Sequence, residues 1–85
     1  MKGDIIEFDN EQLFYDMNLG SIVKILNTKK YEDLEEYIGC YVMRCNERES
    51  DNSYGVTIYH PDGYDIGEFW GNLFDKLSWE IIKEV

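Results

Sequence analysis

Basic residues are scarce in this chain of 85 residues. Lys and Arg together number 8 against 18 Asp and Glu, so the formal net charge is −10. Binding to nucleic acid through the protein's own surface requires a basic patch that neutralises phosphates, and attraction to an anionic membrane requires the same sign of charge. The composition therefore argues against direct contact with nucleic acid or with a membrane surface.

Long apolar runs and a cysteine framework are also missing. Lys2 is followed by no apolar stretch of the kind found in a signal peptide, and no segment approaches the length of a membrane span. The two cysteines, Cys40 and Cys45, are too few for a disulfide scaffold. We therefore expect a cytoplasmic protein with reduced thiols.

Alanine is absent, whereas Ile, Tyr, Asn and Lys are frequent. A lack of alanine together with many β-branched and aromatic residues favours strands over helices. The chain is 44% hydrophobic and 15% aromatic, which argues for a folded protein despite the charge. The same amino-acid usage is associated with AT-rich coding sequences, as in low-GC bacteria and their phages.

The chain contains no linker or repeat, so we predict one domain over residues 1–85. Residues 4–8 are a candidate edge strand, and Asn10–Met17 is a predicted short helix. Asn10 is placed as its N-cap, because asparagine is favoured at that position. Leu13, Phe14 and Met17 form the predicted apolar face of this helix.

Five further strands are expected, because β-branched and aromatic residues cluster between polar segments. They are Ser21–Leu26, Tyr37–Cys45, Tyr54–His60, Tyr64–Trp70 and Trp79–Val85, with a helical turn at Leu73–Leu77 before the last. Asn27–Glu36 is a predicted loop that could hold a helical turn over Tyr31–Tyr37. Pro61-Asp62-Gly63 predicts a tight hairpin turn. A single helix over Ile66–Lys83 is the alternative, since apolar residues there recur every four positions.

This order of elements resembles the SH3-like small β-barrel. Leu19–Leu26 resembles its opening strand, Tyr37–Val42 its G-x-x-V second strand and Tyr54–Ile58 its third. The resemblance covers residues 19–85 and implies a mainly β, five-stranded barrel with residues 1–18 as an N-terminal addition. The Ala-Leu-Tyr-Asp-Tyr signature for proline-rich peptides is missing, so that ligand class is not expected here.

Catalytic and metal-binding patterns are weak. Cys40 and Cys45 are spaced differently from a zinc knuckle, and on one strand they would point to opposite faces. His60 is the single histidine and has no predictable nucleophile beside it. No phosphate-binding glycine loop is present. We therefore predict no enzyme activity, no metal and no cofactor. A small ligand-binding or enzymatic barrel that uses His60 with Asp62 or Cys45 is kept as an alternative.

Acidic residues are the strongest candidate for a functional feature. They form one dense run flanked by tyrosines and one looser group after the predicted turn. The candidate partner-binding residues are Tyr31, Glu32, Asp33, Glu35, Glu36, Tyr37, Asp62, Asp65 and Glu68. Tyrosine is favoured at interfaces, and opposite charge speeds association. A surface that only keeps the protein soluble would also carry such charges.

Taken together, these features predict a non-enzymatic module that binds a basic protein, with a nucleic-acid-binding enzyme as the expected partner. Small size, acidity and an amino-acid usage typical of AT-rich coding sequences fit a phage or mobile-element inhibitor of the anti-CRISPR or anti-restriction type. Its carboxylates would occupy the phosphate-binding channel of the partner in place of DNA phosphates. An immunity protein that neutralises a basic nuclease toxin is the alternative. The sequence leaves open whether the protein is a monomer or a homodimer.

Overall fold

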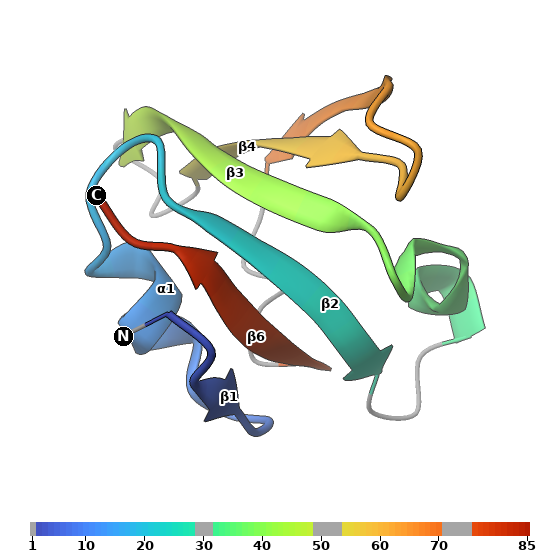
Figure 1. Ribbon diagram of the computed structural model, residues 1–85, viewed down its shortest axis with the longest axis horizontal. Helices are drawn as coiled ribbons and strands as arrows, with labels where there is room; N and C mark the ends of the chain where they lie inside the picture. Colours follow the sequence, from blue (N-terminus) through green and yellow to red (C-terminus); the bar gives the residue numbers. More distant parts are fainter. Residues whose placement is uncertain (1, 29–31, 49–53, 71–75) are drawn as a thin grey trace.

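The structure, a computed structural model, describes residues 2–28, 32–48, 54–70 and 76–85 (Figure 1). Its elements in chain order are β1 (Ile5–Ile6), α1 (Glu11–Tyr15), β2 (Ile22–Thr28), the 3₁₀ helix η1 (Glu32–Tyr37), β3 (Tyr41–Arg48), β4 (Tyr54–Tyr59), β5 (Asp65–Trp70) and β6 (Leu77–Lys83). The mainly β fold is confirmed. No helix in these ranges is long and apolar enough to cross a membrane.

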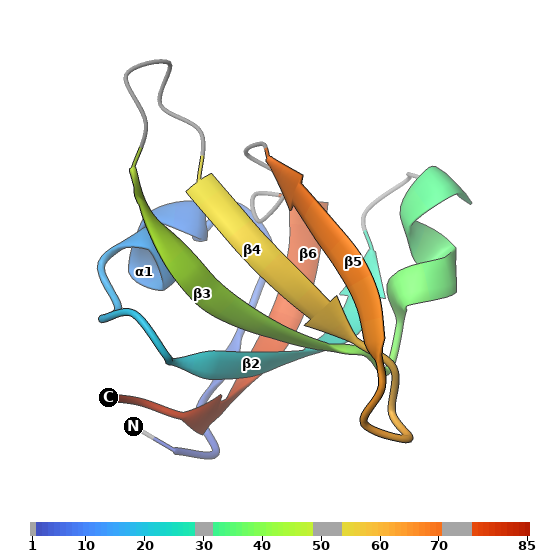
Figure 2. The ribbon, with the colours of Figure 1, turned by 90° about the horizontal axis from the view of Figure 1, so that it is seen from above.

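All six strands belong to one antiparallel sheet with the order β1-β6-β2-β3-β4-β5. β2 is central, because it pairs with β3 on one side and with β6, the last strand of the chain, on the other. The sheet is strongly twisted, so that β5 lies across from β6 in Figure 2, but it does not close. The result is a curved, open sheet with β1 and β5 at its edges.

The prediction of two strands near the C-terminus is confirmed, and the alternative of a single helix over Ile66–Lys83 is wrong. Residues 65–70 and 77–83 are strands. Gly67 has φ of 146°, which no right-handed helix allows. The helical turn predicted for Leu73–Leu77 lies mostly outside the described residues, and Leu77 already belongs to β6.

The second predicted strand begins later than expected. η1 occupies residues up to Tyr37, and β3 starts only at Tyr41. Between them Gly39 has φ of 90°, a backbone conformation that glycine adopts without steric cost. The alternating apolar residues at 37–40 resemble a strand in sequence, but the positive φ ends the 3₁₀ helix there and turns the chain into β3.

The core lies on the concave face of the sheet and is closed by α1. Its buried residues are Phe14, Met17, Val23, Ile25, Cys40, Val42, Ile58, Leu77, Trp79 and Ile81. Phe14 packs edge-on against Trp79, with ring centroids 6.0 Å apart and an interplanar angle of 85°. The N-terminal segment therefore supplies part of the core, because Phe14 of α1 is fully buried and Met17, just after the helix, is almost fully buried.

Two details of the predicted N-terminal helix are corrected. Leu13 is 48% exposed, although it was placed on the buried face with Phe14 and Met17. Asn10 occupies the N-cap position as predicted, but its side chain makes no capping bond to the helix. Its amide nitrogen donates instead to the carbonyl oxygens of Glu7 and Phe8, which stabilises the turn that precedes α1.

Polar contacts fix the connection between α1 and β2 against the end of β6. The buried Arg44 guanidinium of β3 donates to the carbonyl oxygen of Met17. Asn18 donates to the carbonyl oxygen of Val85 at 2.6 Å, and the Val85 amide donates to the Ser21 hydroxyl at 3.1 Å. Buried polar groups are costly unless they are hydrogen-bonded, so these bonds hold both chain segments in one arrangement.

Candidate functional site

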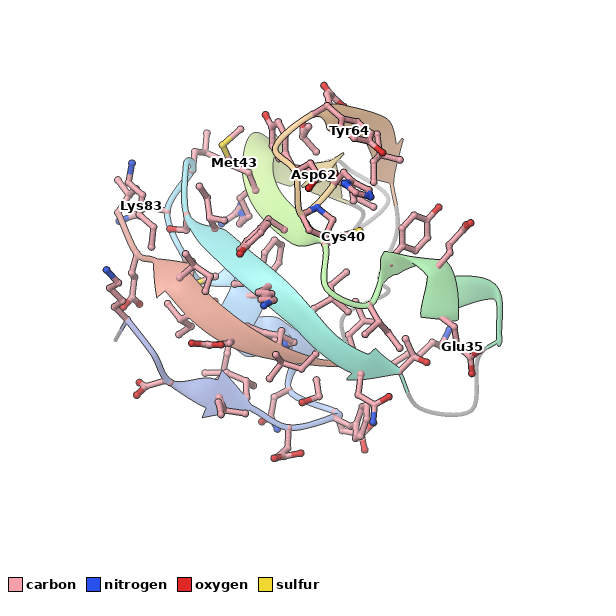
Figure 3. The ribbon with its side chains drawn as sticks, turned by 45° about the vertical axis from the view of Figure 1, so that its right-hand side comes forward. Glu35, Cys40, Met43, Asp62, Tyr64 and Lys83 are labelled. Atoms are coloured by element: carbon pink, nitrogen blue, oxygen red, sulfur yellow. The ribbon has the colours of Figure 1, made fainter. Side chains whose placement is uncertain are left out.

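The two acidic segments predicted from the sequence lie at the same end of the molecule. η1 and the turn between β4 and β5 are neighbours in Figures 1 and 2, and in Figure 3 Glu35, Cys40, Asp62 and Tyr64 lie on one side, away from Lys83. A methyl group placed on Gly39 would lie 3.9 Å from Cγ of Pro61. The chain that leaves η1 therefore packs against the tip of the hairpin.

We call this region the acidic end and define it by Glu35, Glu36, Tyr37, Asp62, Tyr64 and Asp65. Four of these residues are exposed carboxylates, Tyr64 is 58% exposed, and Tyr37 is half-buried. The structure places on one side of the molecule carboxylates that are 26 to 30 positions apart in the sequence. Their shared location makes the acidic end the strongest candidate for a binding surface.

The other predicted partner-binding residues are only partly described. Tyr31 lies outside the described residues. Glu32 and Asp33 belong to the backbone of η1, and Glu68 belongs to β5, but the structure does not describe their side chains. The acidic end is therefore built from the residues whose side chains are described.

η1 is held in place by its C-terminal turn. The amides of Ile38 and Cys40 donate to the carbonyl oxygens of Glu35 and Tyr37, at 3.1 and 2.9 Å. Ile25 of β2 then exchanges two backbone bonds with the following residues: Gly39 donates to its carbonyl at 2.8 Å, and its amide donates to Cys40 at 2.9 Å. Because these bonds tie the end of η1 to a central strand, Glu35 and Glu36 are presented from a fixed backbone.

The β4–β5 turn forms as the Pro61-Asp62-Gly63 sequence predicts. The Gly63 amide donates to the His60 carbonyl at 2.7 Å, and the His60 amide donates to the Tyr64 carbonyl at 2.8 Å. Gly63 has φ of 98°, as a turn that ends in a left-handed residue requires. The turn projects Asp62, whose side chain is 80% exposed, into solvent.

His60 is part of this turn. Its ring stacks on Tyr64, with centroids 4.4 Å apart and planes 9° apart. Its Nδ1 accepts a hydrogen bond from the Asp62 amide at 3.1 Å, and the Asp62 carboxylate lies 3.4 Å from the same nitrogen. These contacts fix the orientation of both rings and leave the outer face of Tyr64 exposed.

The acidic end also carries exposed apolar side chains that the sequence reasoning missed. Tyr64, Ile38 and Ile66 are each more than two-fifths exposed. A surface that mixes aromatic or aliphatic groups with carboxylates can bury area as well as attract charge. Their position in the sequence could have indicated these side chains, because each is the immediate neighbour of a residue in one of the two acidic segments.

Negative charge at this end affects its titratable groups. Burial raises the pKa of the Tyr37 hydroxyl, and the charge of Glu36 and a hydrogen bond to it raise it further. Burial and the charge of Glu36 likewise raise the pKa of the Cys40 thiol. Both groups are therefore neutral at physiological pH, and the Cys40 thiol is a weaker nucleophile than a thiolate would be.

Among the residues that the structure describes, no group of three or more His, Cys, Asp or Glu side chains is arranged to hold a metal ion.

Comparison with protein families, with curated proteins and with solved structures gives no match for this chain. Function therefore has to be argued from the acidic end itself.

Proposed function

We propose that this protein is a non-enzymatic binding module that docks on a basic protein through the acidic end. The observation that supports the proposal is that η1 and the β4–β5 turn lie at the same end of the molecule, where Glu35, Glu36, Asp62 and Asp65 are exposed and the Tyr64 ring is 58% exposed (Figure 3). Complementary charge steers encounter and selects the partner, while the aromatic ring supplies contact area.

The partner we propose is a nucleic-acid-binding protein, because such proteins carry the extended basic surface that a −10 chain would complement. Carboxylates that occupy a phosphate-binding channel would compete with DNA or RNA. Small size and an amino-acid usage typical of AT-rich coding sequences support a phage or mobile-element inhibitor. Its target would be a host defence protein, as for inhibitors of the anti-CRISPR or anti-restriction type.

We also propose that the sheet is a variant of the SH3-like barrel. The pairing of β2 with both β3 and β6 supports this, because a small barrel brings the first and last strands of its chain together. The short β1 strand and α1 then form the N-terminal addition.

Charge reversal tests the docking surface. The double variant Glu35→Lys/Asp62→Lys changes two exposed carboxylates of the acidic end. The matched control Glu7→Lys/Asp16→Lys changes two exposed carboxylates of the N-terminal segment and alters the net charge by the same amount. Tagged proteins are incubated with extract of the source cell, and the captured proteins are identified by mass spectrometry. We expect a basic protein that is captured by the wild type and the control but not by the acidic-end variant.

Equal capture by both variants would contradict the assignment of the docking surface. For the inhibitor, the second readout is competition: duplex DNA or RNA added in excess should displace the protein from its partner. A ternary complex containing both would contradict mimicry of nucleic acid.

A further inference from the structure

β5 forms one of the two edges of the sheet, and it is the longer one: β5 has six residues, whereas β1 at the other edge has two. β5 pairs with β4 on one side, and in the described part of the chain no strand pairs with its other side. At the other edge, residues 3–6 pair with β6, where the Gly3 amide donates to the Ile81 carbonyl at 2.7 Å and the Ile81 amide donates to the Asp4 carbonyl at 2.9 Å. An open edge presents backbone donors and acceptors that another strand can use.

The backbone of Asp65 points toward that open edge. In an antiparallel ladder, hydrogen-bonded pairs alternate with pairs whose amide and carbonyl groups face outward. His60 and Tyr64 form a hydrogen-bonded pair, and the next pair along the ladder is Tyr59 with Asp65. The amide and carbonyl of Asp65 are therefore directed away from β4.

We propose that the edge of β5 binds a short, extended, basic segment of the partner as an added strand. This inference rests on the proposed function and specifies how the partner engages. Strand addition takes its affinity from backbone bonds and its selectivity from side chains. The exposed carboxylates of Asp62 and Asp65 flank the edge, and Ile66, which is 44% exposed, can contact the aliphatic parts of Lys or Arg side chains.

Charge decides between a partner and a second copy of this chain. Pairing two β5 edges would bring together two chains that each have a net charge of −10 and carry the exposed carboxylate of Asp65 on that strand. Like charges opposed across strands are destabilising, and edge charges commonly prevent self-association. A basic segment meets no such repulsion, so the edge discriminates in its favour.

The bulge in β5 limits the length of the added strand. The register with β4 shifts between Ile58 and Tyr59, so that Ile66 has no partner residue, and Gly67 next to it has φ of 146°. A bulge bends the strand and interrupts regular pairing. The edge therefore suits a segment of a few residues rather than a long strand of another sheet.

The first experiment uses a synthetic probe, a short capped peptide of alternating Arg and Thr, and an analogue in which every backbone nitrogen is methylated. Both carry the same charge, but the analogue cannot donate backbone hydrogen bonds. We expect the unmethylated peptide to shift the NMR amide signals of β5 and to bind at least about tenfold more tightly than the analogue, since each lost bond weakens binding several-fold.

The second experiment changes the edge of the protein. Asp65→Pro removes the outward amide, and Asp65→Asn removes the charge alone; proline is tolerated at an edge where its missing donor faces solvent. We expect the peptide to bind Asp65→Asn more tightly than Asp65→Pro. If Asp65→Pro does not fold, the methylated analogue on the wild-type protein decides the question.

Equal affinity for the two peptides, or shifts confined to η1, would overturn strand addition. In that case capture of a basic partner by the wild type, and its loss in Glu35→Lys/Asp62→Lys, would still support the proposed function. If those two proteins capture alike, the proposed function fails, whatever the peptide binds.

Discussion

Leu13 and Phe14 are neighbours in α1 and have opposite environments. Phe14 is fully buried against Trp79, whereas Leu13 is 48% exposed. The helix has only five residues, so the apolar spacing in the sequence allowed either side chain to face the sheet. The choice is made by the sheet, because the large Trp79 side chain of β6 provides a contact surface for one aromatic ring.

We predict that Phe14→Ala lowers the free energy of unfolding by about 3–5 kcal/mol, the usual cost of removing a buried aromatic side chain. The matched control Leu13→Ala, one residue away in the same helix, should cost less than about 1 kcal/mol, because much of that side chain is already in water. Urea unfolding followed by tryptophan fluorescence measures both. Similar losses for the two variants would show that α1 packs differently.

At this scale the sequence predicted the carboxylates of the acidic end but neither its exposed Tyr64 ring nor the arrangement of the two segments. Carboxylates can be read directly from the chain, and Glu35, Glu36, Asp62 and Asp65 were identified in that way. The approach of Gly39 to Pro61 involves segments that are far apart in the sequence, and so does the location of η1 and the β4–β5 turn at one end of the molecule. Such contacts depend on the twist of the whole sheet, which local patterns do not specify.

At the scale of elements, turn chemistry proved more informative than strand patterns. Pro61-Asp62-Gly63 predicted a hairpin, and the β4–β5 turn has the expected hydrogen bonds. Tyr37–Gly39 looked like the start of a strand, yet the 3₁₀ helix ends there and β3 begins at Tyr41. In a short segment, alternating apolar residues are compatible with a strand and with a helical turn. A residue at positive φ is compatible with few backbone conformations, so it indicates a turn more specifically.

Gly63 provides a test of this turn. Its φ is 98°, and a methyl group added there would meet nothing within 4 Å. Gly63→Ala therefore isolates backbone strain, and we expect it to lower the free energy of unfolding by about 1–2 kcal/mol. Gly63→Asn should cost less, because asparagine tolerates positive φ better than alanine does. Thermal unfolding of the three proteins gives the order; an alanine variant as stable as the wild type would contradict the strain argument.

At the scale of the whole molecule, the succession of strands along the chain could be predicted from the sequence. Whether the sheet closes into a barrel could not. The succession of strands and turns predicted β2 through β6 and the edge strand β1, and all are present. Whether the two edges meet depends on accumulated twist and on bulges such as that at Ile66, and the sheet remains open. Net charge is the other property of this scale, since 18 acidic residues share a small surface.

This charge predicts a salt dependence of stability. Repulsion among carboxylates destabilises the compact state, and at physiological ionic strength salt largely screens exposed charges that lie more than about 8 Å apart. We expect the free energy of unfolding to rise between low salt and physiological ionic strength, with a smaller rise in Glu35→Lys/Asp62→Lys, which carries less excess charge. Urea unfolding at several sodium chloride concentrations measures the effect. A stability independent of salt would show that the carboxylates are compensated locally.

The hydrogen bonds near the two ends of the chain have a practical consequence. Gly3 is bonded to Ile81, and Val85 to Asn18 and Ser21, so both ends lie together, away from η1 and the β4–β5 turn (Figures 1 and 2). A sensor surface, a bead or a fluorescent fusion joined at either end would therefore leave the opposite pole facing the solution. The fold thus dictates how the protein is best immobilised, and the hairpin tip is the attachment point to avoid.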